Sequence, residues 1–81
     1  MDPKSKEAFE AKGRQVYEKI KAQLEKNSPG EIVAIEPESG EYFVGKTLGQ
    51  ANDLAFAKYP DKWMYFVRIG SPEAAIALQT W

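Results

Sequence analysis

The sequence predicts one α+β domain with the element order α-β-β-α-β, followed by a C-terminal tail. An apolar stripe with helical spacing occupies the first 27 residues. Three short runs rich in β-branched and aromatic residues follow, and each ends at a turn cluster or a glycine. The connecting segments have the length of ordinary turns rather than of linkers between domains. We therefore expect residues 1–81 to form a single domain.

Residues 1–27 have the pattern of an amphipathic helix. Its apolar positions recur at steps of three, four and seven, which places them on one side of a helix. They are Phe9, Val16, Ile20 and Leu24. Asp2 before Pro3 predicts an N-cap followed by proline at the first helical position, and Pro29 with Gly30 prevents continuation. Gly13 lies on the apolar stripe, where its missing side chain lets another backbone approach.

Residues 31–70 are expected to form a ββαβ core. Residues 31–36 and 41–46 have strand composition, and the turn between them ends at Gly40, so they predict a hairpin. Thr47 then predicts the N-cap of the second helix.

The second helix is expected over residues 48–58, and the third strand over residues 62–69. The helix has one apolar face, which holds Leu48, Ala51, Leu54 and Ala55. The third strand is apolar on both faces and ends at Gly70. We expect an antiparallel sheet in the order 2-1-3, covered on one face by the two helices.

Residues 71–81 form the tail, which is expected to dock. Ser71, Pro72 and Glu73 are typical of a helix start, but three turns are too few for a stable isolated helix. Two helices cover one face of a three-stranded sheet, so the other face is left for the tail or for a partner. One alternative is that the tail folds back and covers this face itself.

The open sheet face and the tail together predict a protein interface, because large aromatic and aliphatic side chains are typical anchors. The expected interface residues are Tyr42, Trp63, Tyr65, Ile76, Leu78 and Trp81. The partner is another protein or a second copy of the chain. We therefore expect a non-enzymatic binding module, and a dimer if the chain binds itself.

The composition excludes several functional classes. The chain has no cysteine and no histidine, so disulfides, thiolate or imidazole metal sites and the commonest catalytic base are absent. We expect no enzyme activity, no cofactor and no metal site. A formal net charge of −1 disfavours a general polyanion binder. No apolar run approaches the ~20 residues of a membrane span, and no leader-like segment opens the chain, so we expect a cytoplasmic protein without membrane contact.

Residues 40–47 match the phosphate-binding pattern G-x-x-x-x-G-K-[ST]. We interpret the match as coincidence, because the intervening residues have strand composition and include Glu41, which would repel phosphate. In the simpler interpretation Gly40 closes the hairpin, Gly45 relieves crowding at the strand end and Thr47 caps the helix.

Two groups of charged residues suggest further ligands. The first, on one flank of the first helix, consists of Lys12, Lys19 and Lys26. It is an alternative site for nucleic acid, although solvated flanking lysines are the commoner arrangement. The second, around the hairpin turn, consists of Glu31, Glu36, Glu38 and Glu41. Paired carboxylates can bind a divalent cation, but here we interpret them as solvated turn charges.

The region from 31 to 70 resembles a known pattern. The residues that carry it are Val33 to Val44, Gly45-Lys46-Thr47 with Ala51, Tyr59-Pro60, and Arg68-Ile69-Gly70. This pattern looks like a group of small prokaryotic proteins of unknown function, and its element order resembles HicB-type antitoxins. The D-L-P-G segment of those antitoxins is absent. The resemblance implies a non-enzymatic, antitoxin-like domain that binds a partner and carries no catalytic residue.

Overall fold

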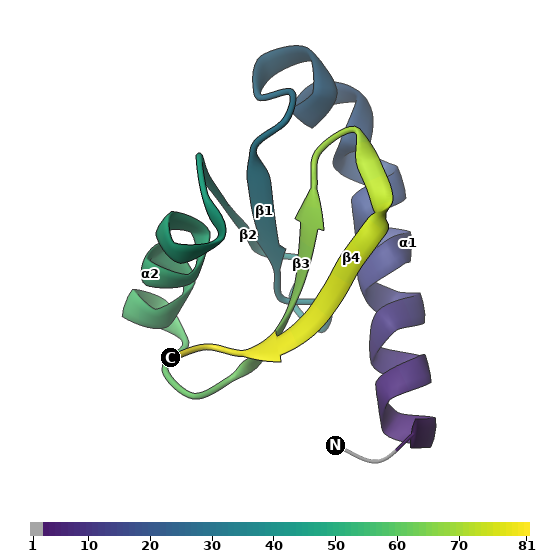
Figure 1. Cartoon of the computed structure of the whole chain (residues 1–81). Helices are drawn as coiled ribbons and strands as arrows, with labels where there is room; N and C mark the ends of the chain where they lie inside the picture. The colour runs from purple at the N-terminus through teal and green to yellow at the C-terminus, as the bar shows by residue number, and fades with distance from the viewer. Residues whose placement is uncertain (1–2) are drawn as a thin grey trace.

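A computed structural model describes residues 3–81, and it contains two helices and a four-stranded antiparallel sheet (Figure 1). The elements are α1 (Pro3–Asn27), β1 (Ile32–Ile35), β2 (Tyr42–Gly45), α2 (Leu48–Lys58), β3 (Trp63–Arg68) and β4 (Ser71–Gln79). The strand order is β2-β1-β3-β4. Both predicted helices, the first three strands and their 2-1-3 order are therefore confirmed. The predicted N-cap Asp2 lies outside the described residues.

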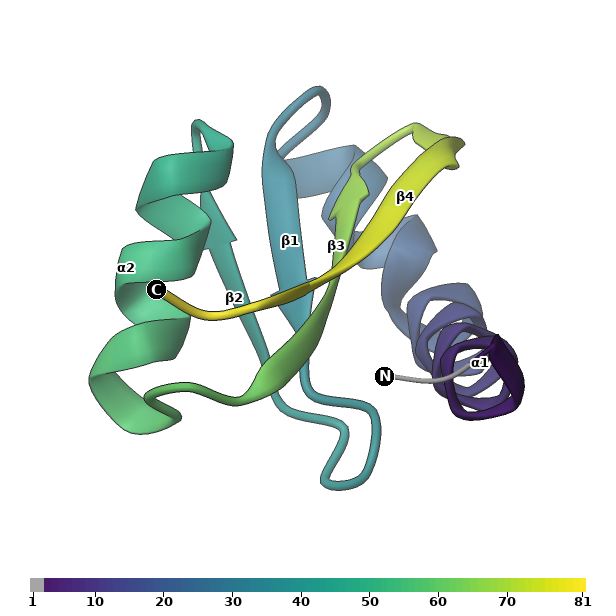
Figure 2. The same cartoon turned by 60° about the horizontal axis from the view of Figure 1, so that its bottom comes forward.

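The two helices lie on opposite faces of the sheet, so the prediction that both cover one face is wrong (Figure 2). Alternate residues of a strand point to opposite faces. On β1, Val33 and Ile35 pack in the α1 cluster, whereas Ile32 and Ala34 pack in the α2 cluster. β3 divides in the same way. Because the central strands are apolar on both sides, each side requires its own cover, and one helix supplies it.

The tail is a strand rather than a helix, and it extends the sheet beyond the predicted three strands. Gly70 has φ +95°, a conformation that glycine adopts freely, and it turns the chain back so that β4 pairs antiparallel with β3. The helix-like start Ser-Pro-Glu is overridden, because the edge of β3 offers a ladder of hydrogen bonds that a short isolated helix cannot match. The tail thus docks on its own chain.

α1 packs closely on the sheet at Gly13. A Cβ added there would lie 2.6 Å from Tyr65 Cδ2 and 2.8 Å from Tyr65 Cβ. The neighbour is therefore an aromatic ring, not the backbone that the sequence suggested. Tyr17, on the same face of α1, is 1% exposed, and its hydroxyl accepts a hydrogen bond from the Gly70 N–H at 3.1 Å. These contacts fix α1 against β3 and the β3–β4 turn.

α2 packs on the other face through small residues. Ala51, Asn52 and Ala55 are fully buried, and a Cβ on Gly45 would lie 2.5 Å from the Ala51 backbone nitrogen. Leu54, expected on the inner face, is 50% exposed. That expectation is wrong because the inner stripe of α2 consists of Leu48, Ala51, Asn52 and Ala55, at helical steps of three and four, and Leu54 lies beside this stripe.

Candidate functional site

β4 forms one edge of the sheet. The Thr80 N–H donates to the Lys62 carbonyl at 2.9 Å, and Trp63 lies opposite Gln79. In an antiparallel pair, hydrogen-bonded and non-hydrogen-bonded positions alternate. The N–H and C=O groups of Ala77 and Gln79 therefore point away from β3, while Ala75 lies at the start of the register shift, next to the last paired residue Ile76. Within residues 3–81, no strand pairs with this outer side.

The second half of β4 lacks the features with which proteins usually protect an edge strand, namely charges, proline or a bulge. Pro72 and Glu73 lie in the first half, and the register shift between Phe66 and Arg68 disturbs the ladder at the same end. Residues 74–79 are uncharged, and residues 76–79 keep one regular register with β3. The opposite edge differs, because β2 has only four residues and α2 packs against it.

A groove of about 200 Å³ runs beside β4 on the α2 face. Its lining residues are Ile32, Leu48, Phe66, Arg68, Ala74 and Ile76. Ile76 is 43% exposed and Trp81 is 58% exposed. These exposed fractions are large for apolar side chains. The Trp81 ring lies 6.4 Å from the Phe66 ring, which forms part of the groove. The exposed edge and an apolar surface thus occur together.

Residues 80 and 81 are fixed to α2 and to the α2–β3 connection. The Asn52 side chain donates to the Trp81 carbonyl at 2.8 Å and accepts from the Trp81 N–H at 3.1 Å. The Thr80 hydroxyl donates to the Tyr59 carbonyl at 2.7 Å and accepts from the Lys62 N–H at 3.0 Å. The sequence did not predict these contacts; the two hydrogen bonds between the Asn52 side chain and the Trp81 backbone are called the Asn52 clasp below. The available signal was a single asparagine between the alanines of α2, since a buried amide needs partners.

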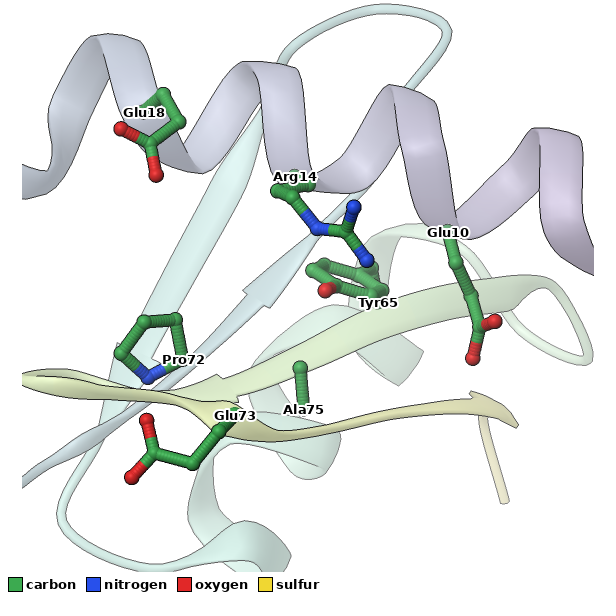
Figure 3. A pocket seen from close by; sticks show the side chains of 7 residues that line it. All are labelled: Glu10, Arg14, Glu18, Tyr65, Pro72, Glu73 and Ala75. Carbon is green, nitrogen blue, oxygen red and sulfur yellow. The ribbon is translucent and has the colours of Figure 1, made fainter.

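The opposite side of β4 faces α1 across a more polar pocket of about 340 Å³ (Figure 3). Its lining residues are Glu10, Arg14, Glu18, Tyr65, Pro72, Glu73 and Ala75. Figure 3 shows the Arg14 guanidinium beside the Tyr65 ring and the Glu73 carboxylate turned away from α1. The lining holds three carboxylates and one guanidinium, and one of the carboxylates, Glu18, pairs with the Lys21 ammonium at 2.9 Å. The apolar groove beside β4 is therefore on the α2 side.

The structure divides the predicted interface residues. Ile76, Leu78 and Trp81 lie together on the α2 side of the β4 end. Tyr65 is only 4% exposed and packs under α1, so it belongs to the core and not to a free surface. The remaining two predicted residues, Tyr42 and Trp63, lie on the α1 side of the sheet, and Tyr42 is at the far edge.

The predicted lysine flank is exposed along α1, at Lys12, Lys19 and Lys26. Lys12 lines a shallow pocket together with Glu38, so an acidic side chain lies near one end of the flank. The nucleic-acid alternative stays a prediction.

The phosphate-loop match corresponds to a strand and a helix cap. Residues 42–45 pair with β1, so their backbone follows a sheet ladder. The Lys46 N–H donates to Gln50 Oε1 at 2.9 Å, and Thr47 Oγ1 accepts from the Gln50 N–H at 3.2 Å. This reciprocal arrangement resembles a capping box, which is the simpler role that the sequence suggested.

Glu36 is buried, which corrects its interpretation as a solvated turn charge. It is 3% exposed, and its carboxylate accepts the Ser39 N–H at 2.7 Å and the Glu38 N–H at 3.2 Å. Burial opposes ionisation, but hydrogen bonds from Ser39 and Glu38 and the Lys62 ammonium 3.9 Å away outweigh it and lower the pKa of Glu36. The carboxylate therefore holds the β1–β2 turn.

Glu36→Gln is expected to lower the free energy of unfolding by about 1–2 kcal/mol at pH 7, because a neutral amide accepts these N–H groups more weakly. The folded pKa lies below the unfolded one, so this stability is present above about pH 4.5 and is lost as the pH falls through the lowered pKa. Urea titrations of both proteins from pH 7 to pH 2 test this. The two stabilities should converge at acid pH. Glu38→Gln, at an exposed position, is the control and should follow the parent chain.

Over residues 3–81, no three acidic side chains gather as ligands for a metal ion. In the same residues, neither helix has the length and apolarity needed to cross a bilayer.

Comparison with known proteins adds no relative. Known protein families, characterised proteins and solved structures give no match to this chain. The resemblance to HicB-type antitoxins therefore stays a prediction.

Proposed function

We propose that the chain is a non-enzymatic protein-binding module that receives an extended segment of a protein chain as a fifth strand on β4. The observation that carries the proposal is the uncharged, unpaired edge of residues 74–79 beside the groove that contains Ile76. Strand addition of this kind combines main-chain hydrogen bonds for affinity with side-chain pockets for specificity.

The edge and the groove have complementary roles. The outward groups of Ala77 and Gln79 would pair with the added strand, each hydrogen bond contributing about 1 kcal/mol net. Alternate side chains of that strand would lie over Ile76 and the groove on the α2 face. Contact with Trp81, already ordered by the Asn52 clasp, requires little further ordering of the backbone.

The antitoxin-like role suggested by the resemblance is a special case of this function, in which the added strand belongs to a toxin. The nucleic-acid alternative uses α1 instead, on the other face of the sheet. A gel shift that weakens steeply with salt and disappears when Lys12, Lys19 and Lys26 are replaced by Gln would favour that alternative.

Photo-crosslinking from β4 tests the proposed function. Benzoylphenylalanine in place of Ile76 is expected to give covalent protein adducts on irradiation in the native cells. The same group in place of Leu54, which lies on α2 and is 50% exposed against 43% for Ile76, is the control. Adducts specific to position 76, whether with another protein or with a second copy, support the function. If neither position gives an adduct, or both give the same ones, the proposal is wrong.

A further inference from the structure

We propose that β4 binds a second copy of the chain, so that two four-stranded sheets join antiparallel across a two-fold axis at Ile76. This inference rests on the proposed function and names the partner. In a two-fold dimer both copies use the same surface patch, so that patch must be complementary to itself. The sequence and the geometry of β4 meet this requirement.

β4 is nearly palindromic about Ile76. An alanine lies on each side of Ile76. The acidic Glu73 lies three residues before Ile76, and Gln79, which has an uncharged hydrogen-bonding side chain, lies three residues after it. An antiparallel pairing centred on Ile76 therefore places Glu73 opposite Gln79 of the second copy. The single charged residue of β4 then meets an amide donor, whereas like charges directly opposite one another would destabilise the pair.

The backbone groups match in the same register. Ala75 of one copy lies opposite Ala77 of the other; the N–H and C=O groups of Ala77 point away from β3, and Ala75 directly precedes Ile76, the last residue of the regular β3 pairing. These are the hydrogen-bonded positions of the new ladder. Ile76 then occupies a non-hydrogen-bonded position, where facing side chains approach most closely.

The side chains on the α2 face are complementary in size. At the axis Ile76 meets Ile76 of the second copy, and on either side the small Ala74 meets the larger Leu78. The two grooves beside β4 become continuous, and Trp81 lies at each end of the paired segment. A standard interface of about 800 Å² per partner would cover about one sixth of the 4929 Å² surface, so the strand pair requires these apolar contacts as well.

Disulfide trapping tests the register directly, because the chain has no cysteine of its own. In Ile76→Cys, the two Cα atoms across the axis should lie about 4.5 Å apart, within the range of a disulfide. We expect mild oxidation at micromolar concentration to give a covalent dimer. Leu54→Cys should stay monomeric. Mixing Ala74→Cys with Leu78→Cys should give mixed dimers in excess of either homodimer.

Sedimentation equilibrium tests the association without cysteine. The parent chain should be dimeric, and Ile76→Lys, which places two ammonium groups at the axis, should weaken the dimer by about tenfold or more. Ala77→Pro removes an outward N–H that the β3 ladder does not use, and it should also give monomers. Circular dichroism confirms that both variants remain folded.

Two results would overturn the self-association. One is a parent chain that remains monomeric at 200 µM, a concentration about two hundredfold above a micromolar dissociation constant. The other is equal disulfide formation by Ile76→Cys and Leu54→Cys. If photo-crosslinking from position 76 still captures a different protein, the proposed function stands and only the identity of the partner is wrong. If position 76 captures nothing, both fail.

Discussion

Asn52→Ala is expected to lower the free energy of unfolding by about 2–3 kcal/mol, the largest effect that we expect from a single polar side chain. The fully buried amide makes two hydrogen bonds, one with the Trp81 N–H and one with the Trp81 carbonyl. Truncation removes both bonds, leaves two backbone groups without these partners and empties part of a packed site. Urea denaturation followed by circular dichroism measures the loss.

The neighbouring Asp53→Ala is the matched control, since Asp53 is exposed on the same helix. It should change stability by less than about 0.5 kcal/mol. Hydrogen exchange adds a local readout, because loss of the clasp should accelerate exchange at Thr80 and Trp81 more than in α1. Equal stability of Asn52→Ala and Asp53→Ala would contradict the structural role of the amide.

Gly13→Ala is expected to destabilise the fold by about 2 kcal/mol, although alanine is the better helix former. The added methyl would lie 2.6 Å from Tyr65 Cδ2 and 2.8 Å from Tyr65 Cβ, so α1 or the ring must shift. Overpacking of this kind costs about 3 kcal/mol, against about 1 kcal/mol gained in helix propensity. Thermal and urea unfolding of the purified variant measure the net effect.

Gly49→Ala provides the opposite case within the same chain. It is also a helical glycine, but the nearest atom to an added Cβ is Thr47 Oγ1 at 3.9 Å. We expect this substitution to stabilise the fold by about 0.5–1 kcal/mol. A second test combines Gly13→Ala with Tyr65→Ala, which should cost less than the sum of the two single changes because the overlap is removed. Stabilisation by Gly13→Ala alone would mean that α1 does not pack on the ring.

The helices and central strands were predictable because each is encoded by a local pattern. Helical spacing of apolar residues indicates α1, and β-branched runs separated by Gly40 indicate the β1–β2 hairpin. The Thr47 cap depends on residues within one turn of each other, so it too was found from the sequence. The apolar character of both faces of β3 was equally evident.

The candidate site was only partly predictable. Ile76, Leu78 and Trp81 were chosen as aromatic or aliphatic anchors, and the structure places them together, but Tyr65 of the same set is buried against Gly13. The side chain of a strand residue points to one of two faces, and the sequence does not say which face a distant helix will cover. Asn52 was missed because its partners lie 29 residues away.

The sequence by itself determined the local elements and the absence of thiol and imidazole chemistry, since both follow from residue type and short-range spacing. Only the tertiary structure decided that α1 and α2 lie on opposite faces and that residues 71–79 form an edge strand. The tail has a helical signal of its own. It becomes a strand because β3 offers unpaired backbone groups across the Gly70 turn, and that competition is settled by contacts between segments rather than within one.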